Sequence, residues 1–454
     1  MPYASVELAR YLTDFQSRNL SPAAIRSVQR CLLDLVGAAL AGVHTRPAEA
    51  FRKLVAALFS SGQASVWFSA ENGPAAAAVL ANSAAASALD IDDGHRSAQG
   101  HPGASIIPAA IAAAQEVDAP GMELITAIAL GYDVAVRIAA ARDSAAQDTL
   151  STGRWCAYGA VAAAARLYGT PVDGVAQALA IAGVQSPGLS ASGYSTVMGN
   201  HVKEGIPWAT FTGLCALQLA RCGFSGPIDI LDHPAYYARE RIVEGLGTGS
   251  AVETVYFKPY ACCRWIHSAL DALGEILAAT PINPDDLRQI RVHSFERALR
   301  LNNYPDPATL EGAQYSINFC LAVLAIEGPK ALLPLEPTLL GRPDLVALAR
   351  KVSLHLDPEI DSRFPGQAGA RVVVISAAGN HEKRCLHPLG DPANPMDFNR
   401  LTSKFHTLTH PYSSQAWREA LIDAVAVLPV AGPRPLFALL KQPPSTTIHG
   451  EIRA

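Results

Sequence analysis

Apolar residues in the first half of the chain recur every three or four positions, which is the spacing of an amphipathic helix. The pattern starts at Ser21 and continues through Ile25, Val28 and Leu32. Ser21 can act as the N-cap, and Pro22 suits the first helical turn. Further Ala-rich segments with the same period are residues 73–89, 104–117, 122–140, 157–168, 172–182 and 208–221. Because Ala and Gly let helices approach closely, we expect a compact all-helical domain.

The pattern changes near residue 254, where short segments typical of strands begin to alternate with helical ones. The strand-like segments are residues 287–295, 351–357 and 370–386, the last with a turn at Gly379 and Asn380 between two extended arms. The helical segments between them are residues 266–278, 313–326 and 345–351. This alternation indicates a small α+β domain.

The chain returns to a helical pattern at residues 415–428, after a Gly- and Pro-rich segment at 390–395. We expect this last helix to pack on the first domain. The predicted fold is mainly α: a large all-helical domain over residues 1–254, completed by residues 405–454, and a smaller α+β lid domain over residues 255–404.

Composition supports two buried cores and excludes several partners. Half of the 454 residues are hydrophobic and 17% are charged, and the formal net charge is −4. Without a Lys- and Arg-rich block, nothing attracts nucleic acid or an anionic membrane. The apolar stretch at 73–89 contains Asn82 and Ser83, so it predicts a buried helix rather than a membrane span. The N-terminus lacks the apolar core of a secretory signal, and we expect a cytoplasmic protein.

A dense group of polar residues follows the nearly uncharged segment at 73–89. Its members are Asp90, Asp92, Asp93, His95, Arg96 and His101. One explanation is a solvated junction between helix and loop. The other is an anion site, because His101 lies between Gly100 and Pro102 at the start of another helix, where backbone N–H groups are free. A metal site is a third reading, but the spacing of a metal-binding helix is absent, and we expect no metal. We therefore predict one wall of an active site for a small anionic substrate.

Two further segments could supply positive charge. In FKPYACCRWIHSALDA, Lys258, Arg264 and His267 surround a turn that precedes a helix, although a solvated basic turn would look the same. Cys263 in this segment is a possible nucleophile, but no base lies near it in sequence, which favours a structural thiol. In MGNHVKEGIPW, Lys203 stands among apolar residues. It can snorkel to solvent, or act as an amine of lowered pKa or a clamp for a carboxylate.

Taken together and in this order, these segments resemble the MmgE/PrpD family. The stretches that carry the resemblance are SALDIDDGHRSAQGHPGASIIPA, YGAVAAAARLYG, GFSGPIDIL, FKPYACCRWIHSALDA, AQYSINF and GDPANP. The family includes 2-methylcitrate dehydratase, cis-aconitate decarboxylase and iminodisuccinate epimerase. The resemblance implies a site between a helical domain and a lid, a homodimer, a small di- or tricarboxylate substrate and no cofactor.

The resemblance also implies roles for individual residues. The family's first active-site aspartate falls on Asp90, the histidine of its HP motif on His101, the lysine before its central helix on Lys203, and its lid lysine on Lys258. His267 matches a histidine that commonly follows the lid turn.

The sequence departs from the decarboxylase-type members at several positions. Gly94 stands where they have Thr, Cys263 where they have His, and Phe319 where they have Tyr. A further histidine is missing from LSTGRWCAYG, which offers Thr152, Arg154 and Trp155 instead. These losses argue against cis-aconitate decarboxylase itself. The pattern after the acidic pair also differs from that of 2-methylcitrate dehydratase.

The reactions of the family share a carbanion or enolate-like species beside a carboxylate, so the site needs cations and a positioned base. We expect His101 to be the leading acid and base. The other expected catalytic residues are Asp90, Lys203 and His267, with His267 on the lid side. The expected substrate-binding residues are Asp93, Arg96, Lys258, Cys263 and Arg154, with Asp90 or Asp93 orienting His101.

Three functions remain open. The leading one is a cofactor-independent lyase of the dehydratase type. The second is an epimerase of an imino- or amino-dicarboxylate, which would reprotonate the same carbanion on its opposite face. The third is a carboxylate-binding protein without catalysis.

Overall fold

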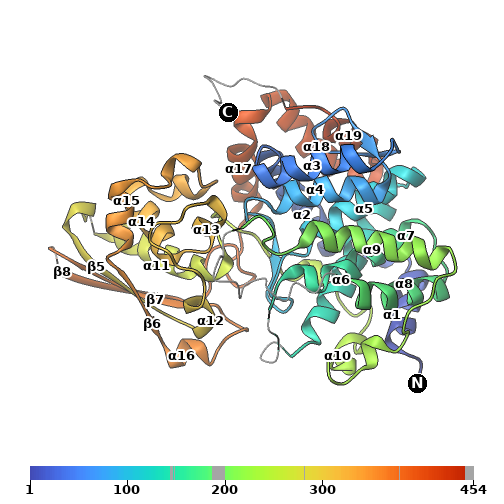
Figure 1. Ribbon diagram of the computed structural model, residues 1–454, viewed down its shortest axis with the longest axis horizontal. Helices are drawn as coiled ribbons and strands as arrows, with labels where there is room; N and C mark the ends of the chain where they lie inside the picture. The colour runs from blue at the N-terminus through green and yellow to red at the C-terminus, as the bar shows by residue number, and fades with distance from the viewer. Residues whose placement is uncertain (144–146, 148, 187–199, 281, 378, 445–454) are drawn as a thin grey trace.

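The computed structural model describes residues 1–143, 147, 149–186, 200–280, 282–377 and 379–444. Figure 1 shows a helical body and, beside it, a smaller unit built on a sheet. The helices of the body before residue 250 are α1 (Ala4–Asp14), α2 (Pro22–Gly42), α3 (Arg46–Leu58), α4 (Ala75–Ser87), α5 (Gly103–Val117), α6 (Gly121–Ala140), α7 (Cys156–Leu167), α8 (Val172–Gln185), α9 (Ile206–Arg221) and α10 (Arg239–Val243). The mainly α fold predicted from the periodicity is confirmed.

Small side chains allow the close packing of the helical body. Ser21 caps α2 as predicted, since its Oγ accepts a hydrogen bond of 2.9 Å from the Ala24 backbone N–H. A Cβ added at Gly131 of α6 would lie 2.6 Å from Ile106 of α5, so the two helices meet at a distance only glycine permits. The same holds for α7, where a Cβ at Gly159 would lie 2.7 Å from Ile106. The Ala- and Gly-rich composition is thus the direct cause of this tight arrangement.

The smaller unit is a four-stranded sheet with helices on one face (Figure 1). The strands are β5 (Leu287–Ser294), β6 (Val352–Leu356), β7 (Ala370–Ser376) and β8 (Gly379–Cys385), in the order β6-β5-β7-β8. β5 is parallel to β6, and the other pairs are antiparallel. The helices of this unit are α11 (Arg264–Ala279), α12 (Glu296–Leu299), α13 (Leu310–Gln314), α14 (Ile317–Glu327), α15 (Pro343–Ala349) and α16 (Pro358–Asp361).

Two details of the smaller unit differ from the sequence prediction. The helix expected over 313–326 is divided into α13 and α14, because Ser316 accepts a hydrogen bond of 3.1 Å from the Phe319 N–H and starts a new helix. Gly379 and Asn380 belong to β8, where they pair with Ser376 and Ile375. The turn predicted at Gly379 and Asn380 is therefore wrong, since both residues are paired in the sheet. Residue 378 lies outside the described residues.

Three C-terminal helices pack on the helical body: α17 (Phe398–Thr409), α18 (Gln415–Ala431) and α19 (Arg434–Leu440). Leu401 and Phe405 of α17 belong to the body's core, so this helix spans the division predicted at residue 405. The chain crosses between the two units near Phe257 and again near Asp391. Within the described residues, no helix is both long and apolar enough to cross a membrane.

Candidate active site

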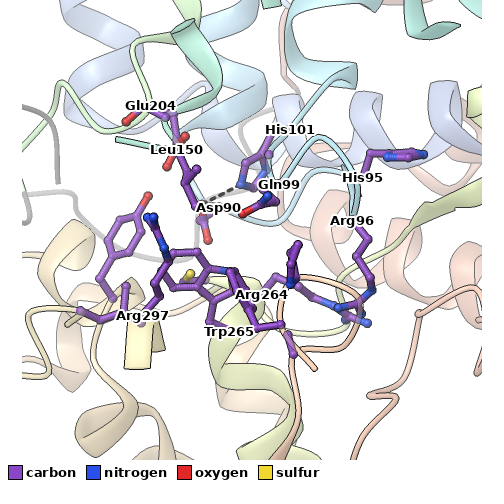
Figure 2. Close-up of a pocket in the computed structure, with 18 of the residues that line it drawn as sticks. Asp90, His95, Arg96, Gln99, His101, Leu150, Glu204, Arg264, Trp265 and Arg297 are labelled. Carbon is purple, nitrogen blue, oxygen red and sulfur yellow. Dashed lines mark ion pairs between the residues drawn. The ribbon is translucent and has the colours of Figure 1, made fainter. Parts of the chain in front are cut away.

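A cavity of about 430 Å³ lies between the helical body and the smaller unit. Before residue 250 its described lining residues are Asp90, His95, Arg96, Gln99, Gly100, His101, Thr149, Leu150, Ser151 and Glu204. After residue 250 they are Tyr256, Cys263, Arg264, Trp265, Arg297, Arg300, Leu301, Tyr315, Phe364, Pro365 and Ala368. Figure 2 shows the two groups facing each other, with His101 and Glu204 on one side and Arg264, Trp265 and Arg297 on the other.

Asp90 lies at the end of α4 with its carboxylate surrounded by cations. Lys258 Nζ donates to its Oδ2 at 3.0 Å and to its backbone oxygen at 2.9 Å. Lys203 Nζ lies 3.9 Å from Oδ1, and His101 Nε2 lies 3.7 Å from the same atom. Burial by itself would raise the pKa of Asp90, but these three charges hold it well below its usual value. Asp90 is therefore a permanent anion.

His101 lies on the cavity wall between two carboxylates. Its Nδ1 is 3.2 Å from Asp92 Oδ2, while Nε2 faces Asp90 (Figure 2). Its backbone N–H donates to Thr152 Oγ1 at 3.0 Å. Burial and Lys258 oppose protonation of the imidazole, but Asp92 and Asp90 outweigh them and raise its pKa above the usual 6.5. His101 can therefore hold a proton near neutral pH and exchange it, as an acid and base must.

The sequence prediction named Asp90 or Asp93 as the residue that orients His101, and Asp90 Oδ1 does lie 3.7 Å from its Nε2. Asp92 makes the hydrogen bond to Nδ1. Asp93 accepts instead from the Gly103 N–H at 3.0 Å and from the Tyr132 hydroxyl at 2.5 Å, and it is absent from the described lining of the cavity. Burial raises the pKa of Asp93 to about 7. Asp93 thus supports the start of α5 behind the wall.

The ammonium groups of Lys203 and Lys258, which were predicted to clamp a substrate, form hydrogen bonds and ion pairs with other groups of the protein. Lys258 is fully buried, and its ammonium group donates a hydrogen bond to the carboxylate of Asp90. Lys203 Nζ donates to the backbone oxygens of Ser87 and Ala88, each at 3.1 Å, and to Gln314 Oε1 at 2.8 Å. Neither belongs to the described lining of the main cavity, although Lys203 lines a small hollow next to it. The lysines hold Asp90 and α4 in place.

Two other predicted residues are absent from the described lining of the cavity. His267 is fully buried in α11, with Nε2 3.1 Å from the Cys262 oxygen and Nδ1 3.4 Å from Arg264 Nη1. Burial lowers its pKa well below 6.5, so it is neutral. It lies next to Arg264 in the interior of the smaller unit. Arg154 ends a short 3₁₀ turn and is likewise absent from the described cavity lining.

Arginines supply the positive charge that the lysines do not. The described lining contains Arg96, Arg264, Arg297 and Arg300, against the carboxylates of Asp90 and Glu204. The sequence prediction included Arg96 among the substrate-binding residues. It missed Arg297 in α12 and Arg300, the C-cap residue of that helix, which also pairs with Glu296 at 2.5 Å. Their spacing of three places them on one side of a single helical turn. Guanidinium groups bind carboxylates in a bidentate manner, so this wall is suited to a polyanion.

Cys263 lines the cavity from the smaller unit, at the position predicted to contact the substrate. Burial raises the pKa of its thiol to about 12. The residue is therefore a protonated thiol and not a thiolate nucleophile. Tyr315, on the same side, also has its pKa raised by burial and stays protonated.

No group of three or more His, Cys, Asp and Glu side chains in the described part of the chain is arranged to hold a metal ion.

The fold and the site define a two-domain protein in which a helical body and an α+β lid enclose a cavity rich in arginine. The chain belongs to the MmgE/PrpD family: the family's N-terminal domain matches residues 6–239, and its C-terminal domain matches residues 260–429. The resemblance seen in the sequence is thereby confirmed.

Two relatives extend along most of the chain. Cis-aconitate decarboxylase from Aspergillus terreus is 25% identical over 476 aligned positions, which cover 96% of this chain and 96% of the relative. The cis-aconitate decarboxylase-like protein oryM from Aspergillus oryzae is 26% identical over 408 positions, covering 82% and 83% respectively.

Proposed function

We propose that the protein is a cofactor-independent lyase of the dehydratase type that acts on a small di- or tricarboxylate. The observation that carries the proposal is the placement of His101, held by Asp92 and Asp90, in a cavity whose other wall carries three arginines. Membership in the MmgE/PrpD family supports it, as does similarity to proteins named cis-aconitate decarboxylase.

In the proposed reaction, Arg264, Arg297 and Arg300 bind the carboxylates of the substrate. Neutral His101 removes the proton from the carbon next to one carboxylate, and the arginines stabilise the negative charge that develops. The new carbon–carbon double bond forms as the bond to the β-oxygen breaks. The leaving hydroxide takes a proton from an acid on the lid side, where Cys263 and Tyr315 are protonated donors.

Epimerisation is the second candidate because the same arrangement has donors on both sides of the cavity. His101 lies on the wall of the helical body, and Cys263 lies on the wall of the smaller unit. A carbanion made by one group could be reprotonated on its other face by the second. No bond to oxygen then breaks.

Proton NMR in D₂O distinguishes these functions. The protein is incubated with citrate, 2-methylcitrate, cis-aconitate, malate-like compounds and imino- or amino-dicarboxylates. Loss or gain of alkene signals indicates a lyase, whereas deuterium exchange without a new compound indicates an epimerase. Binding of several compounds without any exchange would contradict both and favour the carboxylate-binding protein. The His101→Gln protein is the control for exchange that does not depend on the site.

The homodimer and the cytoplasmic location stay predictions. Light scattering coupled to gel filtration tests the first, and cell fractionation tests the second.

A further inference from the structure

The segment GDPANP, residues 390–395, has no role in the reaction described above. It lies in the second crossing between the two units, and it carries Asp391. We propose that Asp391 is a positioning residue that holds Arg96 of the helical body and Arg264 of the smaller unit against the cavity. That Arg264 meets a substrate carboxylate rests on the proposed function, and the position of Arg96 beside it extends that function. That Asp391 holds the two arginines does not rest on it.

Asp391 contacts both guanidinium groups through one oxygen. Its Oδ2 accepts a hydrogen bond from Arg96 Nη2 and lies 3.8 Å from Arg264 Nη2. Both arginines line the cavity, whereas Asp391 is absent from its described lining and is 3% exposed. The carboxylate can therefore affect a ligand only through the arginines that it holds.

The backbone around Asp391 fixes the position of its carboxylate. The side-chain Oδ1 of Asp391 accepts a hydrogen bond of 3.1 Å from the Ala393 N–H. The backbone carbonyl oxygen of Asp391 accepts one of 2.8 Å from the Asn394 N–H. Gly390 has a φ of +89°, and a Cβ there would lie 1.9 Å from the Phe257 oxygen. The turn therefore lies directly on the first crossing. It joins the two places at which the chain passes between the units.

The same turn also binds Arg264 through its backbone. Arg264 Nη1 donates to the Leu389 oxygen at 2.9 Å, and Nη2 donates to the Pro388 oxygen at 3.1 Å. The guanidinium also lies 4.7 Å from the centre of the Tyr256 ring. Arg264 is thus held on several sides, and the carboxylate of Asp391 supplies the charge that these neutral groups lack.

Removing that charge leaves two guanidinium groups facing each other. Burial and the charge of Arg96 both lower the pKa of Arg264, whereas Asp391 raises it. His387 is the other titratable group at this carboxylate, with Nδ1 3.6 Å from Oδ1. In an Asp391→Asn protein the side chain keeps its size but no longer offsets this repulsion, so we expect the guanidinium groups to separate.

Modification by phenylglyoxal, mapped by peptide mass spectrometry, tests this without a substrate. Asp391→Asn should increase the modification rates of Arg96 and Arg264 several-fold over wild type. Arg291 is the internal control, because it is exposed on β5 and its Nε donates a hydrogen bond of 2.9 Å to Gln289 Oε1 rather than to a carboxylate. Glu382→Gln is the matched variant, since it removes a surface carboxylate that pairs with Arg371. Unchanged rates at both arginines in a folded Asp391→Asn protein would overturn the proposal.

Calorimetric binding of tricarballylate, an unreactive tricarboxylate, tests the consequence for ligands. Asp391→Asn should weaken binding about tenfold, and Glu382→Gln should not. Equal affinity for wild type and Asp391→Asn would show that the held arginines do not serve the anion and would overturn the positioning role. If wild type binds none of the carboxylates, the proposed function fails, and the phenylglyoxal rates alone decide whether Asp391 holds the arginines.

A second variant covers the case in which Asp391→Asn unfolds. Replacing Arg96 as well removes one of the two like charges. The Arg96→Gln/Asp391→Asn protein should therefore melt at a higher temperature than Asp391→Asn alone. A lower melting temperature, equal to the sum of the two single effects, would contradict the shared contact.

Discussion

The most informative single residues of the site are those that hold a charge in place. Asp90 is a carboxylate fixed by two lysines, and His101 is an imidazole fixed by Asp92. The two residues differ in what they can do: cations hold the pKa of Asp90 well below its usual value and keep it charged, whereas Asp92 and Asp90 raise the pKa of His101 above 6.5, so His101 can gain and lose a proton. Predictions at this scale therefore concern His101.

Replacing His101 with Gln should abolish turnover and leave the fold intact. The glutamine amide N–H can donate a hydrogen bond to Asp92 in place of Nδ1, but glutamine cannot take a proton from carbon. Turnover is measured with the substrate found in the NMR panel, and circular dichroism checks the fold. A well-folded and active His101→Gln protein would exclude the role of His101 as the base.

Replacing Asp92 with Asn should move the acid limb of the activity profile to lower pH. Asp92 is the largest of the influences that raise the pKa of His101, so its removal lowers that pKa. His101 acts as a base only when it is deprotonated, and in the variant this form persists at lower pH. The measurement is kcat/KM between pH 4 and 9, with Glu382→Gln as the control. If the acid limb of kcat/KM lies at the same pH in the Asp92→Asn protein as in wild type, it reports the titration of a group other than His101.

At the scale of whole elements, helices that are distant in sequence hold the active-site loop. Lys404 of α17 is buried and donates to Asp34 Oδ1 of α2 at 2.6 Å. It also donates to the backbone oxygen of Ile91 at 2.7 Å, between the two functional aspartates. Helix α17 therefore positions the loop that carries Asp90 and Asp92.

Replacing Lys404 with Met should destabilise the protein by about 3–5 kcal/mol, because it leaves the carboxylate of Asp34 buried without its partner. Burial already raises the pKa of Asp34, while Lys404 lowers it. Without Lys404 the folded pKa rises further above the unfolded value. The loss in free energy of unfolding should therefore grow as the pH rises above the unfolded pKa of Asp34. Urea unfolding at several pH values measures this free energy. The Asp34→Asn/Lys404→Met protein should recover part of the stability, and failure to do so would contradict this account.

The short helix α12 should determine affinity for anions through Arg297. Replacing Arg297 with Gln should raise the KM, or weaken binding of tricarballylate, about tenfold, which is about 1.4 kcal/mol. The effect on kcat should be smaller, since the proposed proton transfer takes place at His101. Arg291→Gln, on the exposed part of β5, is the matched control. Equal effects of the two variants would mean that only the overall charge matters.

The accuracy of the sequence predictions depended on how far apart in the chain the cooperating residues lie. The long helices repeat small apolar residues over several turns, so their period is visible in the sequence. The break before α14 depends on one serine within an apolar run, and α12 is a single turn without a detectable period.

The same limit applies to the site. Asp90, Arg96 and His101 are close in sequence, and their common position on the cavity wall could be predicted. Lys258 lies 168 positions from Asp90, and only the resemblance to the family suggested that they belong to one site. The true partner of each lysine depends on side-chain direction, which no pattern of residues specifies. For that reason the sequence prediction named Lys203 and Lys258 together with Arg96 and Arg154, and it missed Arg297 and Arg300.

For the whole molecule, the cavity exists only because two separately packed units meet. Hydrogen exchange should reveal this property. Binding of tricarballylate should slow exchange in residues 95–101 of the helical body and in residues 296–301 of the smaller unit together, because a ligand that bridges the units closes both walls. Mass spectrometry of the exchanged peptides measures the effect, and β8 serves as a distant control. Protection of only one wall would mean that the ligand does not bridge the units.

The backbone conformation of Asp90 makes this position vulnerable to a substitution that removes its charge. Its φ of +54° lies in the left-handed region, which Gly adopts freely and which costs other residues free energy. Exchange of Asp90 for Gly would therefore relax the main chain at the point where the charge of Lys258 is compensated. Protein design that considers only the local backbone conformation would favour the Asp90→Gly substitution. That substitution would leave Lys258 buried without its carboxylate partner. Efforts to stabilise this protein should keep position 90 unchanged.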